Sequence, residues 1–184
     1  QLVSSAQEAL RQYYEAIIDQ SDDELLSLAN VVARLESPRR YPSACLLDPF
    51  VTRAAALSEM LPVGIPDGAL AEDKKKRINE IRAFASAPHA ARDEAIQRFI
   101  DAELNEMKDF FDTIESNPLT PEQGLAVVTD EDASLVLAGA GSGKTSVIVA
   151  KAAYLIERGI REPNEILLMA FGKDAAAEMA ARIE

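Results

Sequence analysis

Apolar residues recur at steps of three and four through most of residues 1–116, which is the spacing of one face of an α-helix. The pattern is clearest from Ala90 to Ile114, where the apolar stripe consists of Ile96, Ile100, Leu104, Met107, Phe111 and Ile114. Residues 61–68 hold two prolines and two glycines, so they predict a loop between helices. The pattern therefore predicts an all-α region over residues 1–116.

Two polar signals predict where helices in this region begin. Ser21 followed three residues later by Glu24 has the spacing of a capping box, in which each side chain bonds the other residue's backbone N–H. Asp48 followed by Pro49 has the form of an N-cap with proline at the first helical position. We expect a second helix after Ser21 and a third after Asp48.

The pattern changes after Pro118. Residues 134–137 (SLVL) and 166–170 (ILLMA) are short apolar runs, which are typical of buried parallel strands. Helical segments follow them, from Lys144 to about Glu157 and from Asp174 to Ile183. Strand, loop, helix, strand and helix in this order predict the beginning of an α/β domain with parallel strands, over residues 117–184.

A glycine-rich segment joins the first predicted strand to its helix and carries the strongest chemical signal in the chain. Its small residues let backbone N–H groups approach phosphate oxygens, and it ends at a helix N-terminus, which favours anions. Lys144 is expected to reach the β- and γ-phosphates, and the Thr145 hydroxyl to bind Mg²⁺. The predicted nucleotide-binding residues of this loop are Ala138, Gly139, Ala140, Gly141, Ser142, Gly143, Lys144, Thr145 and Ser146, with Lys144 and Thr145 also catalytic.

The loop departs from the GxxxxGK[ST] pattern at its first position, where Ala138 replaces glycine. The alternative is a glycine-rich turn with an incidental lysine. The apolar runs on both sides favour a P-loop NTPase.

Two flanking blocks narrow the class. Residues 119–123 (LTPEQ) lie about fifteen residues before the loop, and residues 169–179 (MAFGKDAAAEM) follow the second apolar run. With the loop, these blocks resemble UvrD/Rep-type superfamily 1 DNA helicases. One subgroup of that family gives the best likeness, which covers residues from about 104 to 184.

The resemblance implies a partial RecA-like motor domain that uses ATP and Mg²⁺ to move on single-stranded DNA, in the 3′-to-5′ direction. It implies that Gln123 reads the adenine edge with an amide that both donates and accepts. Thr120 and Gln123 also form a capping box, but the position of Gln123 ahead of the phosphate loop favours the adenine contact. The resemblance also implies that Phe171 lies near DNA, against the alternative of a core side chain. The side chains beside Phe171 differ from the family's Thr-Phe-Thr-Asn-Lys pattern, so they receive no DNA contacts.

Charge and composition narrow the functions and the cellular compartment that the sequence favours. The chain has a net charge of −12, with −8 on residues 1–116 and −4 on residues 117–184, which argues against a protein that coats nucleic acid. The one cysteine, Cys45, cannot form an internal disulfide, and no apolar run reaches the length of a membrane span. These features favour a cytoplasmic protein without a membrane partner.

The enzyme assignment applies to a longer protein. No acidic pair follows an apolar run after the loop, although helicase motors need one to hold Mg²⁺ and activate water. We therefore expect a fragment that binds ATP without hydrolysing it. Two other functions remain: a P-loop ATPase that does not act on nucleic acid, and a helical module whose acidic residues 1–116 recruit a protein partner.

Overall fold

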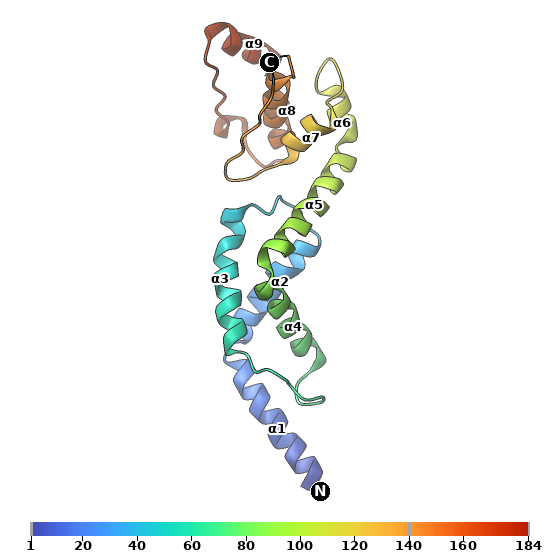
Figure 1. The fold of residues 1–184 in the computed structure, drawn as a ribbon, viewed down its shortest axis with the longest axis vertical. Coiled ribbons are helices and arrows are strands. Elements are labelled where there is room, and N and C mark those ends of the chain that lie inside the picture. The colour runs from blue at the N-terminus through green and yellow to red at the C-terminus, as the bar shows by residue number, and fades with distance from the viewer. Residues whose placement is uncertain (1, 140, 184) are drawn as a thin grey trace. The chain divides into compact units, whose positions relative to one another are not determined.

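The computed structural model describes residues 2–139 and 141–183 (Figure 1). All regular structure within that description is helical. The chain divides by packing into two compact units, Gln1–Arg98 and Phe99–Glu184, and the division falls inside helix α5 (Pro88–Glu106). The domain boundary inferred from the change of residue pattern, at residues 116 and 117, stays a prediction.

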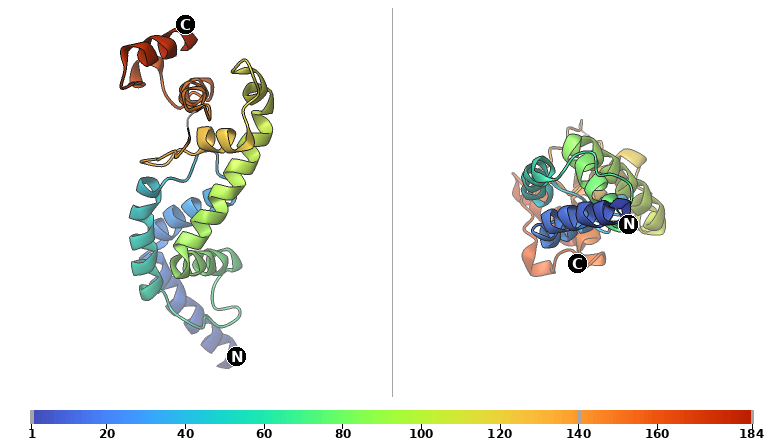
Figure 2. Two further views of the ribbon diagram at one scale, coloured as in Figure 1. Left: turned by 45° about the horizontal axis from the view of Figure 1, so that its top comes forward. Right: turned by 90° about the horizontal axis from the view of Figure 1, so that it is seen from below.

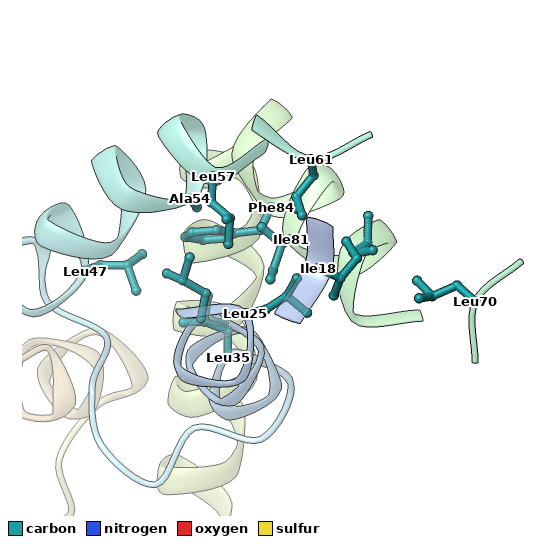
Figure 3. Close-up of a cluster of buried hydrophobic side chains, with 13 residues drawn as sticks. Ile18, Leu25, Leu35, Leu47, Ala54, Leu57, Leu61, Leu70, Ile81 and Phe84 are labelled. Carbon is teal, nitrogen blue, oxygen red and sulfur yellow. The ribbon is translucent and has the colours of Figure 1, made fainter. Parts of the chain in front are cut away.

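The first unit is built from helices packed around one apolar core. Its helices before α5 are α1 (Leu2–Asp19), α2 (Asp22–Glu36), α3 (Ala44–Met60) and α4 (Glu72–Ser86). Figure 3 shows the core that α2, α3 and α4 share, to which Ile18 at the end of α1 also contributes. The first half of α1, residues 4–13, is exposed and projects beyond α2, α3 and α4 in both side views (Figures 1 and 2).

The helix starts in this unit differ in part from those the sequence predicted. α2 begins directly after Ser21 as expected, but the Ser21 side chain makes no capping hydrogen bond. The Glu24 carboxylate instead accepts two hydrogen bonds from Arg53 of α3, at 2.7 and 2.6 Å, and the Ser21 N–H donates to the Ile18 carbonyl at 2.8 Å. α3 begins at Ala44 rather than after Asp48, and Pro49 lies inside it. A proline at this interior position removes one backbone hydrogen bond, and its ring crowds the carbonyl four residues earlier.

Arginine side chains of the first unit donate hydrogen bonds to backbone carbonyls at the ends of its helices. Arg82 donates to the carbonyls of Leu61 and Pro62, at 3.1 and 2.6 Å, just after α3. Arg98 donates to the Leu35 carbonyl at the end of α2, at 3.0 Å. The last carbonyls of a helix have no partner within it, so these contacts satisfy groups that would otherwise need water. Both guanidinium groups therefore bond to backbone carbonyls within the first unit.

The second unit has α8 (Lys144–Glu157) at its centre, packed against α7 (Pro121–Val128) and α9 (Lys173–Ile183). The buried face of α8 consists of Val147, Val149, Ala150, Ala152 and Tyr154. The helix predicted over 90–114 is interrupted at Met107, so α5 ends and the short α6 (Lys108–Thr113) follows. A 3₁₀ turn, η1 (Pro163–Glu165), precedes residues 166–170.

The predicted parallel sheet, and with it the α/β fold class, is wrong. No residue in 2–139 or 141–183 is in a strand, and the runs 134–137 and 166–170 are irregular chain. Leu135 and Leu137 are 84% and 86% exposed, and Leu167 and Met169 are 78% and 80% exposed. A parallel strand needs a neighbouring strand for its N–H and C=O groups and helices over both faces. Neither run has a neighbouring strand in the described ranges.

These exposed runs predict self-association, because clustered exposed apolar side chains favour contact with another molecule. We expect the double substitution Leu135→Ser/Leu137→Ser to reduce concentration-dependent self-association, measured by size-exclusion chromatography with light scattering. The matched control is Met60→Ser/Val63→Ser, which removes two exposed apolar side chains from the first unit. Equal behaviour of the two double variants would contradict the expectation.

No helix in the described ranges is both long enough and apolar enough to cross a bilayer.

Candidate functional site

The glycine-rich loop has the backbone that its sequence requires. Gly141 and Gly143 have φ angles of +75° and +79°, a region that residues with a Cβ rarely adopt. Gly143 is the N-cap of α8, so the helix starts at Lys144, as predicted. A Cβ built on Gly139 or Gly141 would meet no described atom within 4 Å, so the backbone of the loop is open to a ligand at both positions. The predicted contact of Ala140 lies outside the described residues.

Side chains of the loop bond its own backbone. The Ser142 hydroxyl donates to the Gly139 carbonyl at 2.8 Å. The Lys144 ammonium donates to the carbonyls of Ala138 and Gly139, at 3.1 and 2.5 Å. Ser142 and Lys144 therefore bond back to the backbone of residues 138 and 139, and the Lys144 ammonium is held there.

The first turn of α8 has the chemistry of an anion and magnesium site. Lys144, Thr145 and Ser146 occupy this turn, where backbone N–H groups and the helix dipole favour negative charge. Thr145 and Ser146 are half-buried and bring hydroxyl oxygens, which are ligands that Mg²⁺ accepts. The described residues hold no cluster of three or more His, Cys, Asp or Glu side chains suited to a metal. A magnesium ion here would rely on Thr145, phosphate oxygens and water.

Gln123 connects this loop to the start of α7. Its Oε1 accepts from the Thr120 N–H at 2.8 Å, and its own N–H donates to the Thr120 hydroxyl at 3.3 Å, so the capping box is present. Its Nε2 donates to the Ser142 carbonyl at 3.1 Å. A carboxamide has two acceptor lone pairs and two N–H donors, so one of each remains. The capping role of Gln123 is thus compatible with the predicted adenine contact.

Phe171, the predicted DNA-binding residue, is fully exposed at 112% of its reference area. It lies between residues 166–170 and α9, in the same unit as the loop. Phe171 is therefore not a core side chain in this structure. Whether Phe171 contacts DNA stays a prediction.

A polar network that the sequence did not reveal supports α8. Glu103, which is only 8% exposed, accepts hydrogen bonds from the Tyr154 hydroxyl at 3.0 Å and from Arg158 at 2.9 and 2.6 Å. Arg158 also donates to Glu106 at 2.8 Å, which lowers the pKa of that carboxyl. Burial, followed by the charge of Glu103, raises the pKa of the Tyr154 hydroxyl. The network holds the end of α8 remote from the loop against α5.

A second contact holds the middle of α8. The Lys151 ammonium donates to the Thr129 carbonyl at 2.8 Å and to Asp130 at 3.1 Å, just after α7. Burial lowers the pKa of Lys151, and the Asp130 carboxylate opposes that shift. Partners this far apart in the chain give no local sequence signal.

Comparison with known proteins finds relatives for part of the chain. Residues 119–184 match the UvrD/REP helicase N-terminal domain family. The chain is 54% identical over 102 residues to DNA helicase IV of Escherichia coli strain K12, a match that covers 55% of this chain and 15% of that protein. A probable DNA helicase II homolog of Rickettsia conorii is 45% identical over 65 residues, covering 35% of this chain and 10% of that protein.

The ATP-dependent DNA helicase PcrA of Staphylococcus epidermidis is 46% identical over 66 residues, covering 36% of this chain and 9% of that protein. No solved structure matches the chain. The predicted resemblance to UvrD/Rep-type helicases, and within them to DNA helicase IV, is confirmed. The chain spans about a seventh of the length of DNA helicase IV.

Proposed function

We propose that the chain, whose residues 119–184 match the UvrD/REP helicase N-terminal domain, is the ATP-binding portion of an ATP-dependent DNA helicase. Residues 117–184 begin the ATP-binding domain, and residues 1–116 are a helical region ahead of it. The whole protein couples ATP hydrolysis to movement along single-stranded DNA in the 3′-to-5′ direction. The observation that carries the proposal is the open glycine loop at the start of α8, inside the matched segment.

The loop residues 138–143 and the first turn of α8 bind the polyphosphate. Backbone N–H groups at the helix N-terminus donate to phosphate oxygens, and the helix dipole favours the charge. The Lys144 ammonium exchanges its contacts with the Ala138 and Gly139 carbonyls for charge-assisted bonds to the β- and γ-phosphates. Thr145 supplies a hydroxyl oxygen to Mg²⁺. A magnesium ion held there would supply positive charge beside the terminal phosphate.

Gln123 reads the adenine edge with its remaining hydrogen-bonding groups. Its free lone pair accepts from the exocyclic amine, and its free N–H donates to a ring nitrogen of the base. Neither bond requires the capping box at Thr120 to open, because each atom of the carboxamide has one group in use and one to spare. The base and the phosphates thus meet residues from α7 and from the start of α8.

Single-stranded DNA contacts Phe171. Its exposed ring offers a face on which a base can stack, a contact that tolerates any base sequence. The net charge of −12 leaves little general attraction for the DNA backbone, so a local stacking contact suits this chain better than a basic surface. The exposed first half of α1 favours a secondary role for residues 1–116 in holding a protein partner.

We expect the chain by itself to bind ATP without hydrolysing it, because residues 146–184 contain no acidic pair at the end of an apolar run. A graft tests the function of the segment. Residues 119–184 replace the matching segment of DNA helicase IV, and unwinding is measured on duplexes with 3′ or 5′ single-stranded tails. The expected result is ATP-dependent unwinding from the 3′ tail.

The substitution Lys144→Ala in the graft is expected to abolish unwinding. Arg161→Ala is the matched control, because Arg161 is an exposed cation of the same segment whose guanidinium donates to the neighbouring Ile160 carbonyl. Unwinding that survives Lys144→Ala, or a folded graft that never unwinds DNA, would contradict the proposed function.

A further inference from the structure

The Gln123 side chain joins two segments that lie nineteen positions apart in the chain. One end of its carboxamide accepts from the Thr120 N–H, and the other donates to the Ser142 carbonyl. Both contacts are of ordinary hydrogen-bond length, so the side chain is held at both ends. It forms a fixed bridge from the start of α7 to the phosphate loop.

This bridge determines the direction of a backbone N–H group. The Ser142 carbonyl and the Gly143 N–H belong to one peptide unit, which is planar and trans, so the two bonds point in opposite directions. Because Gln123 holds the carbonyl toward α7, the Gly143 N–H points away from α7. Gly143 is the residue from which α8 starts, where an anion would meet the helix.

The close approach of Gln123 also explains the glycine at position 143. A Cβ at that position would lie 2.5 Å from the Gln123 Nε2, much closer than two such atoms can approach. The φ of +79° already favours glycine there. The bridge and the glycine therefore depend on each other, since a side chain at 143 would displace the amide that orients the peptide.

We propose that Gln123 is a positioning residue for phosphate binding: by holding the Ser142 carbonyl it aims the Gly143 N–H at the polyphosphate, whether or not a base is attached. The inference rests on the proposed function and adds to the adenine contact a role that needs no adenine. It differs from base reading in one measurable respect. Affinity for a polyphosphate without a nucleoside depends on Gln123.

Isothermal titration of the 184-residue chain with inorganic tripolyphosphate and with ATP tests the proposal. The variant Gln123→Met keeps the length of the side chain and removes its polar groups. Its affinity for tripolyphosphate is expected to fall about fivefold, as for loss of one ordinary hydrogen bond, with at least the same fall for ATP. The control Gln20→Met makes the same change at an exposed glutamine after α1 and is expected to leave both affinities unchanged.

A second variant separates the bridge from the capping box. Gln123→Glu retains an oxygen for the Thr120 N–H and loses the donor to Ser142. Without ligand, we expect the amide resonance of Gly143 to shift in both Gln123 variants, because the Ser142 carbonyl of the same peptide loses its donor, and the resonances in the middle of α8 to stay unchanged. If Gln123→Glu leaves the Gly143 resonance where it is in the parent, the bridge does not hold the loop and the proposal is overturned.

The two ligands distinguish the possible failures. Loss of ATP affinity in Gln123→Met with full tripolyphosphate affinity would leave base reading alone and overturn the positioning role. Absence of any tripolyphosphate or ATP binding by the parent chain would contradict the proposed function, and with it this inference.

Discussion

Arg158→Met is expected to destabilise residues 99–184 by about 3 kcal/mol, because it leaves the buried Glu103 carboxylate without its cation. Glu103 would keep only the Tyr154 hydroxyl at 3.0 Å and lose both guanidinium bonds. The cost of removing one partner of a buried pair comes mostly from the charge that remains. The effect is large because Glu103 is only 8% exposed and its remaining partner, Tyr154, is itself packed against Phe111.

Glu103→Met, which removes the other partner of the pair, should destabilise the unit less than Arg158→Met. In Glu103→Met the Arg158 guanidinium keeps its bond to Glu106, whose side chain is largely exposed to water. The double variant Glu103→Met/Arg158→Met should recover much of the stability, since apolar side chains of similar volume often replace a buried ion pair at little cost. The expected order of stability is therefore the parent and the double variant first, then Glu103→Met, then Arg158→Met.

The same contacts predict how stability changes with pH. Because Arg158 lowers the pKa of Glu106 in the folded chain, this contact stabilises the fold above the carboxyl's ordinary pKa. That stabilisation is lost as pH falls through the lowered value. Arg158→Met should make the unfolding of this unit less sensitive to acid.

Hydrogen exchange of the α8 amides measures these free energies within the second unit. Arg161→Met is the matched control, since Arg161 is an exposed arginine four residues from the end of α8. A surface change of this kind is expected to shift stability by less than about 0.5 kcal/mol. Equal effects of Arg158→Met and Arg161→Met would show that the Glu103 network does not stabilise α8.

The local features of the site could be predicted from the sequence because each depends on residues close together in the chain. Glycines at positions 141 and 143 are typical of a backbone with positive φ, and both residues have a positive φ. The start of α8 at Lys144 follows from the loop, and the capping box at Thr120 and Gln123 follows from a three-residue spacing. The packing of α2, α3 and α4 likewise follows from an apolar period close to that of a helix.

The sheet could not be predicted in the same way. An apolar run such as residues 134–137 is typical of a buried segment, but a strand also requires a hydrogen-bonding partner for its backbone. In the described ranges the runs 134–137 and 166–170 have no such partner, and Leu135, Leu137 and Leu167 are exposed. The α/β prediction assumed partners that a local pattern does not contain.

Long-range polar contacts were beyond sequence reasoning for a related reason. Glu24 fitted a capping box with Ser21, but in three dimensions its carboxylate meets Arg53, twenty-nine residues away. The contact of Gln123 with Ser142 was also unforeseen, although both residues had been assigned to one site. Spacing along the chain indicates which bonds are available locally and does not indicate which stronger partner competes for them.

Lys144→Ala is expected to have the largest effect on ligand binding. The ammonium is the only cation that the described phosphate loop brings to its own backbone, at 3.1 and 2.5 Å from two carbonyls. Exchanging these neutral acceptors for phosphate oxygens gives charge-assisted bonds, so the loss is about 2 kcal/mol, or about thirtyfold in Kd. The fold should be unaffected, because Lys144 is exposed.

The matched control for this change is Lys173→Ala. Lys173 is exposed and is the first residue of α9, as Lys144 is the first residue of α8. Both substitutions remove one lysine from a helix start, so they change net charge and helix termini alike. Only Lys144 adjoins the glycine loop.

Titration of the parent chain, Lys144→Ala and Lys173→Ala with ATP in the presence of Mg²⁺ tests the claim that the loop binds the phosphates of a nucleotide. We expect saturable binding to the parent and to Lys173→Ala, with an affinity for Lys144→Ala about thirtyfold lower. The same ATP affinity in all three proteins, or no binding to the parent, would contradict the claim.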